Sequence, residues 1–144
     1  MADNLIQNFL VNNIPATTSL KNALDANAAR QRAHTQNIAN AETPGYQRVR
    51  VEFEDLLSDA INGSNSKLAR SDDRHLSSDI ANEIAGVQHR VEREPIDPAS
   101  DNLNGVDIDQ EMAEMAETQL RYLASIELLK RRYEGMKQAI RGGG

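Results

Sequence analysis

The residues of this chain that could carry out chemistry are few and widely spaced. Its three histidines are His34, His75 and His89, and no two of them stand four residues apart, as two zinc ligands on one helix would. Asp107 and Asp109 could attract a cation, but no calcium-binding loop follows them, and Asp107 is better placed to cap a helix. The sequence therefore predicts no metal site.

Motifs of nucleophilic and phosphate chemistry are also absent from the sequence. There is no Gly-x-Ser-x-Gly motif, no glycine-rich phosphate-binding loop and no cysteine. Without cysteine, the chain can form neither a disulfide nor a thiolate metal site. We expect no catalytic residues and no cofactor, and we predict that the protein is not an enzyme.

The composition predicts a protein that is elongated or that completes its core with a partner. The chain has 144 residues, of which 26% are charged and only 3% are aromatic. A compact domain of this length usually contains more large apolar side chains. The net charge of -6 argues against nucleic acid as a partner. No run of 18 apolar residues is present to span a membrane.

The stretch NIANAETPGYQRVRV, residues 37–51, predicts a sharp corner. Asn37 and Asn40 are poor residues inside a helix, but they can satisfy free backbone groups at its end. Pro44 ends a helix, and Pro44-Gly45 suits the two central positions of a type II turn, where glycine adopts a positive φ. Apolar and charged residues then alternate over residues 48–54, as in a half-buried strand. The predicted corner motif consists of Asn37, Ile38, Asn40, Thr43, Pro44, Gly45 and Tyr46.

Each side of this corner carries a predicted surface. The helix before it has a thin apolar stripe that polar residues interrupt, and its members are Leu20, Leu24, Ala28, Gln31, Thr35 and Ile38. The charged residues after it are expected to form one face towards solvent or towards another subunit, and they are Arg48, Arg50, Glu52 and Glu54.

Residues 107–141 are the clearest predicted helix. Apolar residues recur there at alternating steps of four and three, which is the period of a coiled coil. Asp107 with Gln110 matches a capping box, and an acidic start and a basic end suit the helix dipole. The predicted seam, which we expect to be an assembly interface, consists of Ile108, Met112, Met115, Tyr122, Ile126, Leu129, Tyr133, Met136 and Ile140.

The predicted fold class is mainly α, with elongated N- and C-terminal helices that pack as a coiled coil, a short β or loop segment between them, and a core completed by assembly. The expected divisions are a leader over residues 1–16, one helical domain from residues 17–43 and 107–141, and a segment of turn, short strands and irregular loop over residues 44–106. The leader has no basic residue before Lys21 and is not a cleavable secretory signal. Two alternatives stay open: a helical hairpin covered by the middle segment, and a coiled coil that only dimerises.

Two stretches of the chain resemble one known family. NIANAETPGY is similar to the signature of bacterial flagellar rod and hook axial proteins, in which an Asn-x-x-Asn helix end leads into Thr-Pro-Gly-Tyr. NGVDIDQEMAEMAETQLRYLASIELLKRRYEGMKQAI, residues 104–140, resembles the C-terminal helix of the same family. The Leu-x-Tyr pair at Leu120 and Tyr122 and the short length are most similar to the proximal rod members. The resemblance covers residues 17–57 and 95–140.

The resemblance implies a structural subunit of the proximal rod of the flagellar basal body. Such a subunit is exported by the flagellar type III apparatus and polymerises into the hollow drive shaft that transmits torque across the periplasm. The resemblance implies a leader over residues 1–16 that serves export or ring contact. In such a stack, we expect the acidic start and the basic end of the helix over residues 107–141 to align subunits head to tail, through basic residues that include Lys130, Arg131 and Arg132. The implied partners of this homo- and hetero-oligomer are further copies of the chain, other flagellar rod proteins, the rod adaptor protein and the membrane (MS) ring at the base, and the export apparatus. The alternative is a coiled-coil adaptor or oligomerisation module without catalytic activity.

Overall fold

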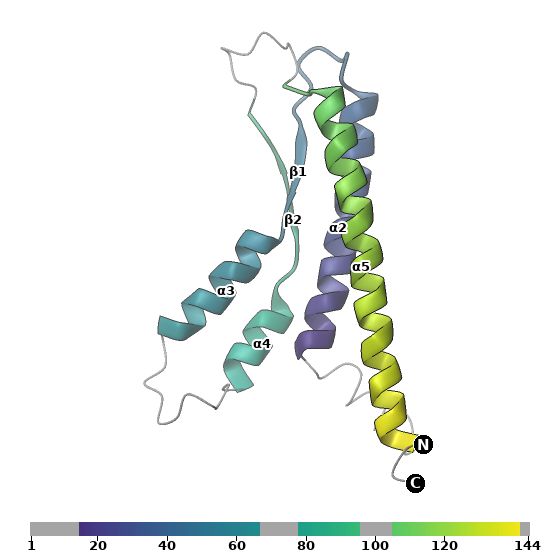
Figure 1. Cartoon of the computed structure of the whole chain (residues 1–144). Coiled ribbons are helices and arrows are strands. Elements are labelled where there is room, and N and C mark those ends of the chain that lie inside the picture. Colours follow the sequence, from purple (N-terminus) through teal and green to yellow (C-terminus); the bar gives the residue numbers. More distant parts are fainter. Residues whose placement is uncertain (1–14, 67–77, 96–104, 142–144) are drawn as a thin grey trace, which may run out of the picture.

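The protein is an elongated helical hairpin with a smaller arm beside it (Figure 1). This computed structural model describes residues 15–66, 78–95 and 105–141. The hairpin pairs α2 (Pro15–Ala39) with α5 (Ile108–Arg141), which run in opposite directions, so that the end of α2 and the start of α5 share one end of the molecule. The arm contains β1 (Val49–Glu52), α3 (Glu54–Ser66), α4 (Ser78–Gly86) and β2 (Arg90–Arg93). The predicted mainly α fold class, with terminal helices packed together around a short β segment, is confirmed.

Helix α2 begins at Pro15 and ends at Ala39, several residues before the proline that was expected to end it. Proline suits the start of a helix because the first N–H groups have no partner within the helix. At the other end, the Asn40 side chain donates to the carbonyl of Gln36 (2.8 Å), and the Asn40 carbonyl accepts from the Thr43 N–H (2.9 Å). These bonds replace the helical ladder, so the chain leaves the helix before Pro44. The leader, except for residues 15 and 16, lies outside the described residues.

The two strands form a short antiparallel ribbon. Val49 faces Arg93 and Val51 faces Val91 in the register of the pair. The alternation of the sequence is reproduced, because Val49, Val51 and Phe53 are buried against the hairpin. With Ala29 and Ala33 of α2, the two valines form the small apolar cluster of the described chain.

The arm contains two helices that the sequence did not predict, so the prediction of irregular loop is wrong for α3 and α4. Helix α3 includes Asn62 and Gly63, which are weak helix formers, and α4 has only nine residues. Tertiary contacts support both helices. The Asn22 amide of α2 donates to the carbonyls of Ala85 (2.9 Å) and Val87 (2.7 Å), which caps the end of α4.

The hairpin interface is more polar than the two sequence stripes suggested. The residues of the predicted stripe on α2 are at most half-buried. The fully buried residues of this helix are instead Thr17, Ala26, Asn27, Ala29, Ala33, His34 and Asn37. Helix α5 buries only Glu111 and Thr118. Ala29 and Ala33 pack against the valines of β1, whereas Glu111 and Thr118 of α5 contact His34 and Asn37 of α2. Polar side chains therefore occupy these buried positions, and the predicted apolar seam does not.

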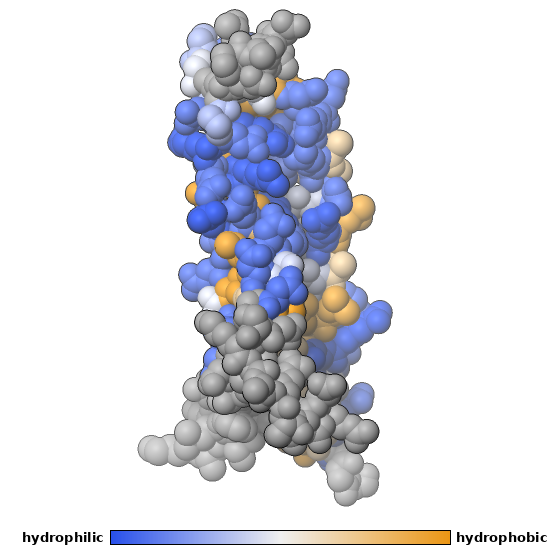
Figure 2. Space-filling model, turned by 90° about the vertical axis from the view of Figure 1, so that its left-hand side faces the viewer, coloured by the Kyte–Doolittle hydropathy of each residue, from blue (hydrophilic) through white to orange (hydrophobic). Residues whose placement is uncertain are grey.

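Hydrophobic side chains instead remain on the outside of the molecule. Figure 2 shows a largely hydrophilic face on which hydrophobic residues gather towards one edge. Large hydrophobic side chains of α5 that are at least 40% exposed are Ile108, Met112, Leu120, Leu123, Ile126, Leu128 and Ile140. Within the described residues, no helix combines the length and the apolar character that crossing a membrane requires.

Candidate functional site: the buried polar corner

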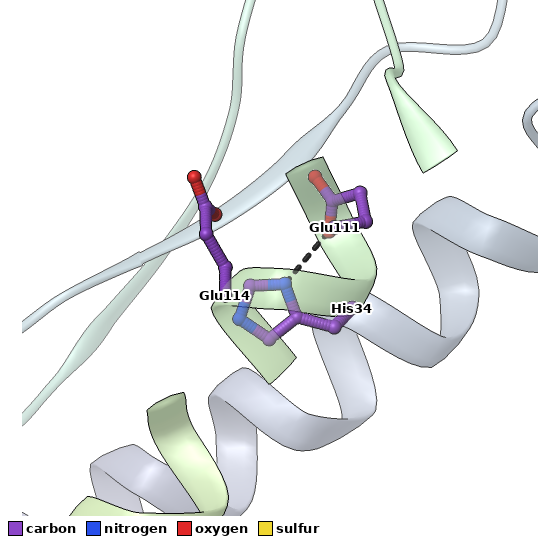
Figure 3. A group of neighbouring side chains, drawn as sticks. All are labelled: His34, Glu111 and Glu114. Carbon is purple, nitrogen blue, oxygen red and sulfur yellow. Dashed lines mark hydrogen bonds and ion pairs between the residues drawn. The ribbon is translucent and has the colours of Figure 1, made fainter. Parts of the chain in front are cut away.

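The centre of the corner is the carboxylate of Glu111, whose side chain is only 1% exposed. Helix α5 presents it one turn after its own start, where Asp107 caps the helix by accepting from the N–H groups of Asp109 (2.9 Å) and Gln110 (3.2 Å). The His34 Nδ1–H of α2 donates to Glu111 Oε2 over 2.7 Å (Figure 3). The predicted cap at Asp107 is thus confirmed, and it fixes where Glu111 enters the hairpin.

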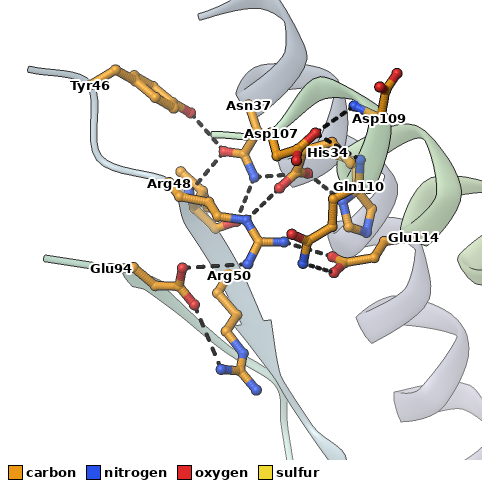
Figure 4. A network of polar contacts seen from close by, with 12 residues as sticks. His34, Asn37, Tyr46, Arg48, Arg50, Glu94, Asp107, Asp109, Gln110 and Glu114 are labelled. Carbon is orange, nitrogen blue, oxygen red and sulfur yellow. Dashed lines mark hydrogen bonds and ion pairs between the residues drawn. The ribbon is translucent and has the colours of Figure 1, made fainter. Parts of the chain in front are cut away.

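Asn37, which is completely buried, ties three parts of the chain together (Figure 4). Its Nδ2 donates to the carbonyl of Val49 (2.9 Å) and to Glu111 Oε2 (3.1 Å). Its Oδ1 accepts from the N–H of Val49 (2.8 Å) and from the hydroxyl of Tyr46 (3.0 Å). Because the amide satisfies both backbone groups of Val49, it acts on β1 as a neighbouring strand would.

The turn of the corner has the predicted backbone. The N–H of Tyr46 donates to the carbonyl of Thr43 (3.2 Å) across Pro44 and Gly45. Gly45 has φ = 74°, close to the value of the third residue of a type II turn. This turn returns the chain so that the Tyr46 hydroxyl reaches Asn37.

Arg48 adds the positive charge of the network. Its Nε–H donates to Glu111 Oε1, and its Nη2–H donates to Glu114 Oε2 over 2.7 Å. On its other side it reaches Glu94, which follows β2, at 3.4 Å (Figure 4). One guanidinium therefore joins the ribbon to the start of α5.

The contacts change the acidity of the buried groups. Burial by itself would raise the pKa of Glu111, but the hydrogen bonds from His34, Arg48 and Asn37 outweigh burial and hold that pKa below its ordinary value of 4.5. Burial by itself would lower the pKa of Arg48, but the neighbouring carboxylates raise it. Burial raises the pKa of the Tyr46 phenol above 10.0. The network is therefore an ionised carboxylate and an ionised guanidinium held by side-chain hydrogen bonds.

The same residues offer a geometry that could be mistaken for a metal centre. His34, Glu111 and Glu114 each place one ligand atom within 4.8 Å of the others (Figure 3). However, the His34 Nδ1–H already donates to Glu111, and the Arg48 guanidinium contacts both carboxylates. A metal ion would have to displace the Arg48 guanidinium from these carboxylates, so the arrangement favours a structural ion-pair network.

The residues of the predicted corner motif are only partly brought together. Asn37 and Tyr46 join the buried network, and Asn40 and Thr43 bond to one another at the helix end, with 3.4 Å between the Thr43 hydroxyl and Asn40 Oδ1. The remaining members shape or flank the turn, and they are Ile38, Pro44 and Gly45. The predicted face of charged residues is formed in part. Arg50 and Glu52 lie on β1 opposite the buried valines, whereas Arg48 turns towards α5 and Glu54 binds Arg30 of α2 (2.7 Å).

The predicted seam splits into two sets. Met115, Tyr122, Leu129, Tyr133 and Met136 are half-buried. The other four are exposed, with Ile108 at 42%, Met112 at 54%, Ile126 at 40% and Ile140 at 60%. The described chain thus leaves a large part of the seam without cover.

Local sequence patterns did not indicate the roles of His34, Glu111 and Glu114 in the network, or the contact of Arg48 with α5. In the sequence, Glu111 is only one of the residues at the acidic start of the predicted helix. Its position three residues after Ile108 and four before Met115 was the available signal, since it places Glu111 at the border of the seam.

The comparisons with known proteins agree on one family. The family described as "Flagella basal body rod protein" matches residues 19–47, which contain most of α2 and the turn. A protein of Cereibacter sphaeroides named "Flagellar basal body rod protein FlgB" is 36% identical over 83% of this chain and 89% of its own length. Proteins of the same name from Bacillus subtilis and Escherichia coli are each 30% identical, covering 87% and 84% of this chain and 92% and 89% of their own lengths.

The fold and the site together define a structural protein, in which polar contacts hold a helical hairpin and its arm while apolar side chains stay outside. The similar proteins identify the family of structural proteins to which the chain belongs. The chain belongs to the family of the flagellar basal body rod protein FlgB. It is a structural subunit of the flagellar basal body rod, not an enzyme, and membership of this family implies assembly with other flagellar components.

Proposed function

We propose that this chain is a subunit of the proximal rod that the flagellar type III apparatus exports and that polymerises into the hollow, torque-transmitting shaft in the periplasm. The observation that carries this proposal is the exposed part of the seam on α5. The helix buries Glu111 and Thr118 in its own hairpin and leaves Ile108, Met112 and Ile126 outside. A subunit that shares its core with neighbours needs such a surface.

The energetic argument for assembly rests on the four exposed seam residues. Full burial of a large aliphatic side chain contributes about 1.5–3 kcal/mol. Covering Ile108, Met112, Ile126 and Ile140 in a neighbour would thus supply a substantial driving force, reduced by the cost of association. A shallow groove with mostly apolar walls continues this surface towards the end of α5, lined by Ile126, Leu129 and Tyr133 with charged residues at its rim.

The polar corner supports the same role from inside the subunit. Asn37, Arg48 and Glu111 connect α2, the ribbon and α5. We propose that this rigid corner holds the β arm at a fixed angle, so that the arm can brace neighbouring subunits. At the base of the rod, the proposed partners are the rod adaptor protein and the membrane (MS) ring, and further rod proteins follow above.

Deletion of the gene in its flagellated host, followed by imaging of isolated basal bodies, tests the proposal. We expect non-motile cells whose membrane ring carries no rod. Cells that still assemble rotating filaments would contradict a role in the proximal rod, and a coiled-coil adaptor would then be the better account. A purified protein that forms a stable and closed dimer would favour that alternative as well.

Complementation of this deletion tests the seam itself. The Met112→Ser/Ile126→Ser variant should be secreted but should fail to restore rods, because it removes two exposed apolar contacts without touching the buried network. Leu128→Ser is a matched control, since Leu128 is 53% exposed, as Met112 is at 54%, but lies outside the predicted seam. Equal complementation by both variants would contradict the assignment of the interface.

A further inference from the structure

The two edges of the ribbon that lies beside the hairpin differ in their hydrogen bonds (Figure 1). The N–H of Glu94 donates to the carbonyl of Arg48 (2.8 Å), which continues the register of β1 and β2 by one pair. In an antiparallel pair, the backbone groups of successive residues point alternately towards the partner strand and away from it. Those of Val49 therefore point away from β2, and the Asn37 side chain binds both of them. Helix α2 thus closes the edge of β1.

The same alternation leaves the outer edge of β2 open. The backbone N–H and carbonyl groups of Val91 and Arg93 point away from β1, because these residues face Val51 and Val49 in the register. Within residues 15–66, 78–95 and 105–141, no hydrogen bond is made to these four groups. The Val91 side chain beside them is 57% exposed. An unpaired edge of this kind can accept a further strand.

The sequence of β2 is complementary to itself in one antiparallel register. If Val91 lies opposite Val91 of a second copy, Arg90 lies opposite Glu92 of that copy, and Glu92 lies opposite its Arg90. In its own subunit, Arg90 contacts Glu52 of β1 (3.0 Å), and Arg50 faces Glu92. Across four strands, each row of charges would then alternate in sign, and the two exposed valines would cover one another.

Other registers of the two copies are less favourable. A displacement by two residues would place Glu92 opposite Glu92 in one direction and Arg90 opposite Arg90 in the other, and like charges directly opposite are destabilising. A displacement by one residue would set the outward backbone groups of one strand against residues whose groups already point towards β1. The open edge and the charges therefore favour the same register.

We infer that β2 of one copy pairs with β2 of a second copy in this register, so that two ribbons form one four-stranded antiparallel sheet. Both copies use the same surface, so the contact is isologous and closes on itself. The contact is small and largely polar, so we expect a weak dimer that dissociates on dilution. It uses the ribbon and not the seam of α5, so it goes beyond the proposed function and differs from a coiled-coil dimer.

Cysteine cross-linking of the purified full chain tests the register, because the wild type contains no cysteine. Under mild oxidation, Val91→Cys should form a covalent dimer at least about tenfold faster than Asp59→Cys, an exposed change on α3. The two Cα atoms at position 91 would lie about 5.5 Å apart, which a disulfide can span.

Arg93→Cys is the matched control on the same edge of β2, where Arg93 is also exposed. Two copies of this variant would hold their cysteines about 13 Å apart along the strands, beyond the reach of a disulfide. Alone it should cross-link no faster than Asp59→Cys. An equimolar mixture with His89→Cys should form the mixed dimer, because residue 89 of one copy falls opposite residue 93 of the other.

A second variant blocks the edge itself. Val91→Pro removes the outward N–H and none of the bonds between β1 and β2, and proline is tolerated on edge strands. Sedimentation of the wild type over about 0.01–1 mM should show a shift from monomer to dimer. Val91→Pro should stay monomeric, whereas Val91→Ile, which keeps the N–H and the branched side chain, should still dimerise. Circular dichroism checks the fold of each variant.

Three results would overturn the inference: a wild type that stays monomeric over this range, a Val91→Cys variant that cross-links no faster than Asp59→Cys, or an Arg93→Cys variant that by itself cross-links as fast as Val91→Cys. The cysteine variants keep every backbone hydrogen bond, so these results do not depend on the folding of Val91→Pro. Failure here leaves the deletion and complementation experiments unaffected, so the ribbon contact and the rod function can fail separately.

Discussion

At the scale of single residues, the corner depends on amide and carboxylate groups in an interior with few large apolar side chains. The side-chain amide of Asn37 forms hydrogen bonds with both the N–H and the carbonyl of Val49, and the guanidinium of Arg30 donates to the carbonyl of Val51 over 3.3 Å. Side chains of α2 thus cover the edge of β1 that faces the hairpin. This covering explains why a ribbon of two short strands is stable beside the helices.

Asn37→Ala should destabilise the protein by about 2–3 kcal/mol, because it leaves buried backbone groups of Val49 without partners. Urea unfolding followed by circular dichroism measures this change. Asn40→Ala is the control, and we expect a smaller loss of about 1 kcal/mol or less since its bonds lie at an accessible helix end. An equal loss of stability in both variants would show that burial of the Asn37 hydrogen bonds adds nothing to their contribution.

The lowered pKa of Glu111 makes stability depend on acid pH. The folded state favours the ionised carboxylate, so this contribution is fully present above the ordinary pKa of 4.5 and is lost as pH falls through the lowered folded value. Urea midpoints between pH 7 and pH 3 should decline for the wild type. Glu111→Gln should lose about 2–4 kcal/mol at pH 7 and show a shallower decline below pH 4.5.

The control for this titration is Glu117→Gln, which removes an exposed ion pair with Arg121. It should change stability by about 0.5 kcal/mol or less and keep the acid dependence of the wild type. An acid profile of Glu111→Gln that is parallel to that of the wild type would mean that other carboxylates cause the loss.

At the scale of elements, a turn, a cap and a side-chain brace decide where α2 ends and where β1 lies. The turn needs the positive φ of Gly45, the cap is Asp107, and the brace is Asn37. The element boundaries follow from these local bonds rather than from helix propensity, which explains why α2 stops at Ala39 although the next residues permit a helix.

Gly45→Val should destabilise the protein by about 1 kcal/mol or more, because a β-branched residue is strained at φ = 74°. Among the described residues, apart from the two neighbours of Gly45 in the chain, no atom lies within 4 Å of the position of an added Cβ, so the effect comes from backbone strain. Thermal unfolding and rod assembly are the measurements. A variant with wild-type stability and motility would contradict the turn assignment, and Gly45→Asn, which tolerates this conformation better, should be less affected.

At the scale of the whole molecule, the contacts are concentrated in the half of the hairpin near the corner. The small apolar cluster and the Glu111 network lie there, whereas the last turns of α5 contact α2 through Arg132 and Thr17. Most side chains from residue 134 to residue 141 are exposed. An isolated subunit should therefore open first at the end where both termini of the hairpin lie.

Hydrogen exchange of the monomer tests this difference. Amides of residues 128–141 should exchange faster than those of residues 112–122, because local opening is easier where few buried contacts exist. Assembly should slow exchange at residues 128–141, since a neighbour then covers Ile140 and the adjacent groove. Uniform exchange along α5 in the monomer would contradict the proposed gradient.

The sequence by itself determined the features that depend on local chemistry. Neighbouring residues determine the helical period of residues 107–141, the cap at Asp107 and the Pro44-Gly45 turn. The NIANAETPGY stretch contains the signature that indicated the family. Only the tertiary structure decided which faces meet. His34 and Asn37 of α2 bind Glu111 inside the hairpin, and part of the apolar seam is left exposed. The partners of Arg48, and the helices α3 and α4, likewise depend on residues distant in the chain, whose contacts no local pattern encodes.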